Sequence, residues 1–353
     1  MAEGSPRFVP DVGPTGGTAL GNSYLSTWAN CPREWFNLYY RPIIGYDEND
    51  KEVIRRGIQL PTTATPLING RIFHEAIGEW YNSGVRDGDD TGERSVEKAI
   101  DMARTHWTRA AGMNEYGGGA EESEESWRLL EQMIRDYHND FGPDSMEPEF
   151  PEIRVVCDDQ GQPLIEREWV APLKPGYNYT CRTDLIVTYR GNLMTMEHKS
   201  ATRSSARMML NSLATASQFT GEYWILSEIF PEEVLSGVLV NVVFKGPRPK
   251  TARAQFQQAA VRESTTRSPG MIEAWKKECI HILDQIEESI GEFDKLIQEG
   301  GDPEQAMMSC FPIHGIRTGR CNAYGRNCDY YNLCMLAGME ARQLNQFRPK
   351  VWD

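Results

Sequence analysis

The sequence predicts an α/β (α+β) fold in which a mixed β-sheet core is flanked by helices. Two observations support this prediction. β-branched and alternating segments occupy the middle of the chain, and apolar residues at helical spacing come before and after them. Strands enclosed by helices in this order give a sheet that helices cover. The 353 residues are enough for about two domains, or for one elaborated domain.

The N-terminal part of the chain is predicted to be helical after a flexible leader over 1–21, which is rich in Gly and Pro. We interpret 22–150 as one helical region, and Cys31-Pro32 is expected to interrupt its first helix. Its expected elements are a helix over 22–40, a loop over 50–66, a helix over 67–81, and two helices within 94–141 on either side of the glycines at 117–119.

The predicted core over 151–300 contains the strands, and a cysteine-rich tail over 301–353 follows it. The expected strands are 152–157, 164–170, 179–189, 193–198, 236–244 and, more weakly, 255–263. Helices are expected over 213–229 and 269–298.

The charge is uneven along the chain. The net charge of −14 argues against nucleic-acid binding, because phosphate contacts require a basic surface. However, 111–150 alone contains eleven acidic and two basic residues, and 241–270 contains six basic residues and one acidic residue. The acidic block is interpreted as a solvated helical face or as a docking surface for a basic partner. No window approaches the roughly 18 apolar residues of a membrane span, so no membrane partner is expected.

A predicted hairpin carries the chemistry. If Arg190-Gly191 is its two-residue loop, Asp184 lies opposite Glu197; if the loop is Gly191-Asn192, Asp184 lies opposite Lys199. In both registers these three side chains share one face of the sheet. Two carboxylates beside an ammonium form a site for Mg²⁺ or Mn²⁺, which would activate a water molecule, and Lys199 would assist. A surface salt bridge is the plainer alternative.

Several motifs together resemble a known nuclease superfamily. The pattern Asp184…Glu197-His-Lys199 resembles the signature of PD-(D/E)xK nucleases, with Thr183 in place of Pro. Gly70-Arg-Ile-Phe-His74 is similar to the helix that supplies an extra His in the RecB-like branch. The opening Cys31-Pro-Arg and the cysteine tail resemble AddB-type iron–sulfur exonucleases of that branch. The resemblance implies a restriction-endonuclease-like core with a helical region clamped by a cluster at the two chain ends.

The resemblance also implies roles for individual residues. His74 would bind the metal with Asp184 and Glu197, and the backbone carbonyl of His198 would be a further ligand. The imidazole would shift the preference from Mg²⁺ toward Mn²⁺. Gln218 would contact the active site. Tyr223 stands five residues later, where the family has a four-residue spacing, and is considered a DNA contact or a core residue, because five residues leave the two side chains about 140° apart.

The tail contains Cys321, Cys328 and Cys334 within 14 residues. A closed four-thiolate site requires a fourth ligand, for which Cys31 is the best candidate. Four thiolates suit Zn²⁺ or an iron–sulfur cluster, and the resemblance favours [4Fe–4S]. The first spacing of the tail is longer than in the family, so Cys310 is an alternative to Cys321.

We therefore expect a metal-dependent DNA exonuclease that acts on single strands or duplex ends in recombination, repair or replication. It would be cytoplasmic, in a bacterium or a phage-infected host, and a recombination or replication protein would be its partner. The alternatives are a CRISPR-associated RecB-like nuclease and a non-catalytic scaffold that binds DNA ends. The expected phosphate contacts are Arg203, Arg207, Lys245, Arg248 and Lys250.

Overall fold

The computed structural model describes residues 20–46, 51–61, 64–113, 115, 119–231, 235–246, 258–335 and 344–350. The predicted leader lies almost entirely outside these residues. The chain forms two compact units, which are described separately. Unit 1 comprises Met1–Pro61, Pro172–Thr180 and Glu273–Asp353, and unit 2 comprises Thr62–Ala171 and Cys181–Ile272.

Unit 2 is built on a mixed β-sheet, as the sequence predicted. The sheet has the order β11-β10-β9-β8-β6, and β7 also pairs with β8. Strand β10 runs parallel to β9, whereas the β8–β9, β6–β8 and β10–β11 pairs are antiparallel. The strands are β6 (Ile153–Val155), β7 (Ile165–Lys174), β8 (Tyr177–Tyr189), β9 (Asn192–Thr202), β10 (Leu235–Lys245) and β11 (Ala260–Thr265). The C-terminal end of β7 and the N-terminal end of β8 belong to unit 1.

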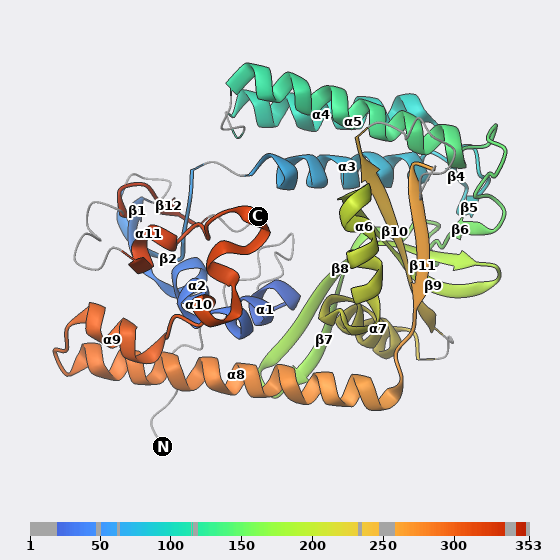
Figure 1. Ribbon diagram of the computed structural model, residues 1–353. Coiled ribbons are helices and arrows are strands. Elements are labelled where there is room, and N and C mark those ends of the chain that lie inside the picture. The colour runs from blue at the N-terminus through green and yellow to red at the C-terminus, as the bar shows by residue number, and fades with distance from the viewer. Residues whose placement is uncertain are drawn as a thin grey trace. The chain divides into compact units, whose positions relative to one another are not determined.

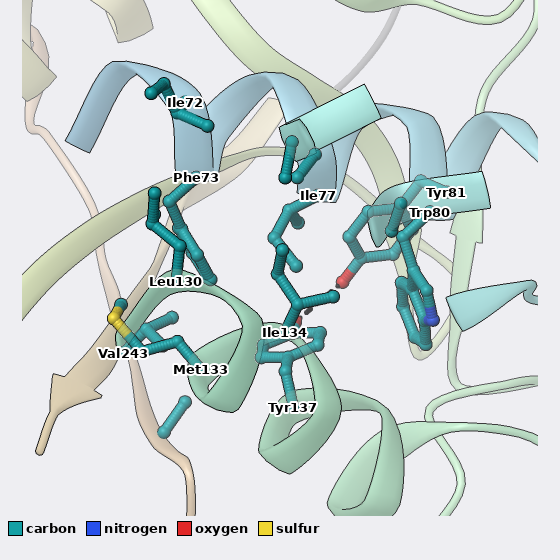
Figure 2. Close-up of a cluster of buried hydrophobic side chains, with 14 of the residues drawn as sticks. Ile72, Phe73, Ile77, Trp80, Tyr81, Leu130, Met133, Ile134, Tyr137 and Val243 are labelled. Atoms are coloured by element: carbon teal, nitrogen blue, oxygen red, sulfur yellow. Dashed lines mark hydrogen bonds between the residues drawn. The ribbon is translucent and has the colours of Figure 1, made fainter. Parts of the chain in front are cut away.

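Helices cover both faces of this sheet (Figure 1). On one face lie α3 (Thr65–Asn82), α4 (Val96–Gly112) and α5 (Gly119–Phe141), whose apolar side chains share one core with the sheet. Figure 2 shows Phe73 and Ile77 of α3 packed against Leu130 and Ile134 of α5. The other face carries α6 (Arg203–Ser212) and α7 (Ser217–Ile229), with a 3-10 turn, Leu213–Thr215, between them. Two short strands, β4 (Val85–Arg86) and β5 (Asp89–Asp90), follow α3.

A buried polar network connects the first helical layer to the sheet. The Glu149 carboxylate accepts hydrogen bonds from the hydroxyls of Tyr81 on α3, at 2.6 Å, and Tyr137 on α5, at 2.8 Å. It also pairs with the guanidinium of Arg262 on β11. Asn241 on β10 donates to the Tyr137 hydroxyl at 2.8 Å. Three elements of unit 2 therefore meet at one buried carboxylate, and β10 joins them through Tyr137.

Unit 1 brings the two ends of the described chain together. Trp35 and Phe36, which follow Cys31-Pro32, pack in an aromatic cluster with Phe293 and Phe311 from the C-terminal part. Its helices are α1 (Asn22–Asn30), α2 (Pro32–Trp35), α8 (Pro269–Gln298, which begins in unit 2), α9 (Pro303–Cys310), α10 (Gly315–Thr318) and α11 (Tyr331–Met335), with a π-helical turn over Phe36–Tyr40 and a 3-10 turn over Arg320–Gly325. Its strands are β1 (Pro42–Tyr46), β2 (Glu52–Arg56), β3 (Ile58–Gln59) and β12 (Arg348–Pro349).

Two predictions of secondary structure were wrong. The expected loop over 50–66 contains β2 and β3, because β2 pairs with β1 and β3 pairs with β12, and neither partner is evident from the local pattern. The helix expected over 213–229 is broken at Ala216, and the preceding α6 was not predicted. Of the residues of α6, only Ala206 is buried, and Met209 and Leu210 are partly buried against the sheet. Among the described residues, no helix is long and apolar enough to cross a bilayer.

Candidate functional site

The β8–β9 hairpin has the register in which Arg190-Gly191 is the loop and Asp184 lies opposite Glu197. Tyr189 pairs with Asn192 across a two-residue turn, in which Arg190 and Gly191 have φ values of +51° and +80°. Positive φ at both central residues is the requirement of a tight type I′ turn. The ladder ends at the pair Leu185–Met196, immediately before Asp184 and Glu197.

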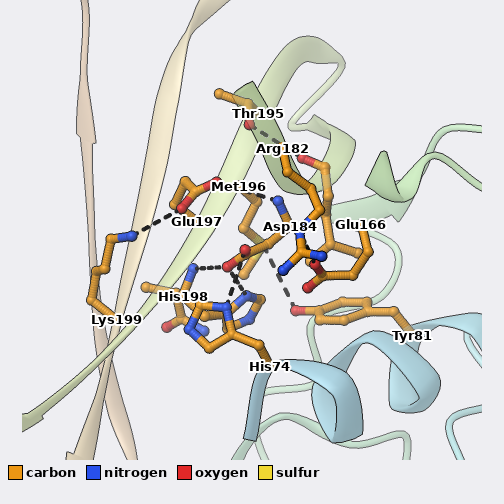
Figure 3. Close-up of polar contacts among 12 residues, drawn as sticks. His74, Tyr81, Glu166, Arg182, Asp184, Thr195, Met196, Glu197, His198 and Lys199 are labelled. Carbon is orange, nitrogen blue, oxygen red and sulfur yellow. Dashed lines mark hydrogen bonds and ion pairs between the residues drawn. The ribbon is translucent and has the colours of Figure 1, made fainter. Parts of the chain in front are cut away.

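Beyond that last pair, side chains replace the backbone ladder (Figure 3). The Asp184 N–H donates to Glu197 Oε1 at 3.2 Å, and the His198 N–H donates to Asp184 Oδ2 at 2.6 Å. Each carboxylate therefore accepts a hydrogen bond from the backbone of the opposite strand. This exchange fixes both carboxylates at the point where the strands separate. Both residues are buried there, since Asp184 is 9% exposed and Glu197 is 1% exposed.

Lys199 and helix α7 surround the Glu197 carboxylate. Lys199 Nζ lies 3.1 Å from Glu197 Oε2, and the Gln218 side-chain amide donates to the same oxygen at 3.3 Å. Gln218 also donates to Glu222 Oε1 at 2.8 Å. Gln218 therefore contacts Glu197, and its role at an active site stays a prediction. Glu222, one helical turn after Gln218, is a site residue that the sequence reasoning missed.

Tyr223 does not reach this site. Its hydroxyl donates to the Leu235 carbonyl at 2.9 Å, and its ring packs against the apolar core between α7 and the sheet. The 140° separation from Gln218 expected for five helical residues explains the difference. Its position is that of the core alternative and does not support the DNA contact.

His74 approaches Asp184 from helix α3. Its Nδ1 lies 3.1 Å from Asp184 Oδ1. Gly78, four residues later on the same helical face, allows close packing, because a Cβ there would lie 3.2 Å from Ile165 on β7. This contact brings Glu166, the next residue of β7, toward His74.

Glu166 is the second residue that the sequence reasoning missed. One ligand atom from each of His74, Glu166 and Asp184 lies within 4.8 Å of the others. The structure thus groups Glu166, and not the predicted Glu197, with the other two at this distance. Glu166 has a φ of +50°, which is uncommon for a residue with a side chain. The predicted role of the His198 carbonyl as a ligand stays a prediction; the His198 side chain is buried against Tyr81 and Tyr137.

Burial and neighbouring charges shift the pKa values of several side chains in this site. Burial, followed by the charge of Asp184, raises the pKa of Glu197 and of Glu166 to about 7. Burial also raises the pKa of Glu222. Burial lowers the pKa of His74, but the charge and hydrogen bond of Asp184 outweigh it and the net shift is upward. Although burial opposes it, His74 and His198 hold the pKa of Asp184 well below its usual range.

The expected phosphate contacts divide into three groups. Arg203 is used inside the protein: it donates to the carbonyls of Gly246 and Gln258 and stacks on Phe244. Arg207 on α6 is exposed, and Lys245 at the end of β10 is half-buried. Arg248 and Lys250 lie outside the described residues.

The four predicted cluster cysteines come together in unit 1. The side chains of Cys31, Cys321, Cys328 and Cys334 line one small cavity. Cys310, the alternative ligand, is buried in α9 and does not line it. The packing is tight, because a Cβ on Gly315 would lie 2.9 Å from Cys321 Sγ.

Charged residues of the Cys-Pro-Arg-Glu segment support this cavity. Arg33 is buried and donates to the carbonyls of Phe311, at 2.8 Å, and Met307, at 3.2 Å. Glu34 lines the cavity and accepts two hydrogen bonds from Arg320, at 2.7 and 2.8 Å. Both ends of the described chain are thus tied together beside the thiols.

Comparison with protein-family profiles and with curated proteins gave no match to this chain.

Proposed function

We propose that this protein is a divalent-cation-dependent DNA exonuclease of the RecB-like PD-(D/E)xK type, with an iron–sulfur cluster in unit 1. The observation that carries the proposal is the reciprocal bonding of Asp184 and Glu197 at the open end of the hairpin, with Lys199 and His74 against them. Acidic, imidazole and ammonium groups converge there from three elements of one unit, α3, β8 and β9. Buried carboxylates that lie this close together are unfavourable unless a cation pairs with them or a proton neutralises them.

The side chains have distinct roles in this proposal. Asp184, Glu197 and His74 provide oxygen and nitrogen ligands of the kind that Mg²⁺ and Mn²⁺ bind. When bound, the cation would lower the pKa of a water molecule and neutralise charge on the scissile phosphate. Gln218 holds the Glu197 carboxylate, and Glu197 orients Lys199, whose ammonium stabilises negative charge on the phosphate oxygens.

The chemistry of the cavity in unit 1 suits a metal cluster. Four soft sulfur ligands face a single space, and Gly315 leaves no room for a larger residue beside Cys321. Burial raises the pKa of Cys334 to about 11 and that of Cys328 to about 12, so these thiols lose their protons when metal binds. The role of the cluster in this proposal is structural, because its bonds would join Cys31 near one end of the chain to the tail cysteines near the other.

The test uses protein purified without oxygen, Mn²⁺, and end-labelled single- and double-stranded DNA. We expect stepwise shortening from free ends, while a covalently closed circle stays intact. Lys199→Ala should lower the cleavage rate by about 100-fold or more, because it removes a preorganised charge. Lys98→Ala, at an exposed lysine of α4, is the matched control and should cleave at the wild-type rate.

If wild-type protein cleaves no faster than Lys199→Ala, the nuclease proposal fails. Retained binding to DNA ends would then favour the non-catalytic scaffold. Cleavage of the closed circle would replace the exonuclease assignment with an endonuclease.

A further inference from the structure

The Glu166 carboxylate has two sets of partners that compete for it. One oxygen, Oε2, lies 3.1 Å from Nε of Arg182. The same carboxylate belongs to the group with His74 and Asp184 whose ligand atoms lie within 4.8 Å of one another. Figure 3 shows the Arg182 guanidinium beside the Glu166 carboxylate, with Asp184 and His74 in the same group of side chains.

The two partners of Glu166 differ in exposure. The Glu166 side chain is 20% exposed, whereas that of Arg182 is 51% exposed. Arg182 stands two residues before Asp184 on β8, at the outer edge of the site. An exposed guanidinium can exchange its partner at low cost, because solvent screens the ion pair. The carboxylate cannot leave as easily, since the close packing of β7 on Gly78 holds it beside His74.

The group of His74, Glu166 and Asp184 also has the composition of a metal site. An imidazole and two carboxylates on separate elements are a ligand set that Mn²⁺ accepts readily. Each residue comes from a different element, α3, β7 and β8, so the set is positioned by the fold and not by one loop.

We propose that Glu166 is a further divalent-cation ligand and that cation binding transfers it from Arg182, whose guanidinium then binds a DNA phosphate. The inference rests on the proposed function, because it names the phosphate of DNA as the second partner of Arg182. In the cation-free protein, Arg182 forms an ion pair with the Glu166 carboxylate. In the cation-bound protein, Glu166 binds the cation together with His74 and Asp184, and Arg182 is available at the edge of the site. Cation and DNA therefore each favour binding of the other.

The first experiment measures Mn²⁺ binding without DNA, from the loss of the free-ion electron paramagnetic resonance signal on titration. Glu166→Gln should weaken Mn²⁺ binding by about tenfold or more. Glu263→Gln is the matched control, because it changes an exposed carboxylate on β11, another strand of the same sheet, and should bind Mn²⁺ like the wild type. Wild-type affinity and stoichiometry in Glu166→Gln would overturn the proposal.

The second experiment uses Arg182→Gln, which should change the two affinities in opposite directions. Without its competitor, Glu166 should bind Mn²⁺ at least as tightly as in the wild type. The KM for DNA cleavage should rise about tenfold, with kcat little changed, because a charge-assisted phosphate contact is lost. Weaker Mn²⁺ binding in Arg182→Gln, or an unchanged KM, would contradict the exchange.

These readouts separate the inference from the proposed function. A protein that binds Mn²⁺ through Glu166 but cleaves no DNA would keep the metal ligand and refute the nuclease. A protein that cleaves DNA while Glu166→Gln binds Mn²⁺ normally would keep the nuclease and refute the ligand. Circular dichroism and thermal melting of each variant exclude loss of folding as the cause.

Discussion

At the scale of single residues, Gly315 decides whether four thiols can share one cavity. A methyl group at this position would lie 2.9 Å from Cys321 Sγ, which is closer than side-chain atoms approach in folded proteins. Gly315→Ala should therefore displace Cys321 and lower the iron and sulfide content of anaerobically purified protein. Gly291→Ala is the control: it lies on the exposed side of α8 with open space around it, and should stabilise the helix by up to about 1 kcal/mol.

The cysteines themselves give the companion prediction of metal content. Cys31→Ser should lose the cluster, because it removes the only ligand from the N-terminal segment, whereas Cys310→Ser should keep it. Elemental analysis separates the outcomes: zinc without iron would assign the cavity to Zn²⁺. Loss of metal from Cys310→Ser but not from Cys321→Ser would restore the alternative ligand set.

The residues found and missed by sequence reasoning differ in how they are positioned. Asp184, Glu197 and Lys199 were predictable because strand alternation and a tight turn are local. Glu222 could also have been predicted, since it stands four residues after Gln218 and helical spacing alone indicates a shared face. Glu166 was not, because its place depends on a positive φ and on the packing of β7 against Gly78.

At the scale of elements, the buried Glu149 network holds α3, α5, β10 and β11 together. Glu149→Ala would leave the Arg262 guanidinium without its buried partner and remove the acceptor of two tyrosine hydroxyls. We expect unit 2 to lose about 3–5 kcal/mol of stability, as when one partner of a buried ion pair is removed. Urea denaturation measures this change. Glu147→Ala, at an exposed neighbour, should change stability by no more than about 0.5 kcal/mol.

The predicted elements show the same distinction between local and distant causes. The bounds of α8, Pro269–Gln298, agree with those expected from its apolar periodicity. The break at Cys31-Pro32 is also confirmed, because Cys31 is extended and Pro32 begins α2. In contrast, β3 exists only because β12, almost 300 residues later, pairs with it. The network around Glu149 is likewise invisible in the sequence, since its members come from separate elements.

At the scale of the whole molecule, the buried acids of the candidate site make stability depend on pH. Glu197 and Glu166 have pKa values raised to about 7, and those of Glu222 and His74 are also raised. Such groups bind more protons in the folded state, so each loses stabilisation as pH rises from its unfolded to its folded pKa. The lowered pKa of Asp184 matters only in more acidic solution. His198 and His138 have lowered pKa values and oppose the trend, but they are fewer.

Protein freed of exchangeable divalent cations should therefore melt at a lower temperature at pH 8 than at pH 5.5. Mn²⁺ should restore the midpoint mainly at pH 8, where its ligands are deprotonated; at 100 times its Kd it would add about 2.7 kcal/mol. Glu222→Gln should flatten the pH dependence in the cation-free protein, because it removes one buried carboxyl whose second oxygen has no hydrogen-bond partner. Scanning calorimetry across pH gives the measurement. A midpoint that rises from pH 5.5 to 8, or an equal effect of Mn²⁺ at both, would show that these carboxylates do not share a cation-dependent site.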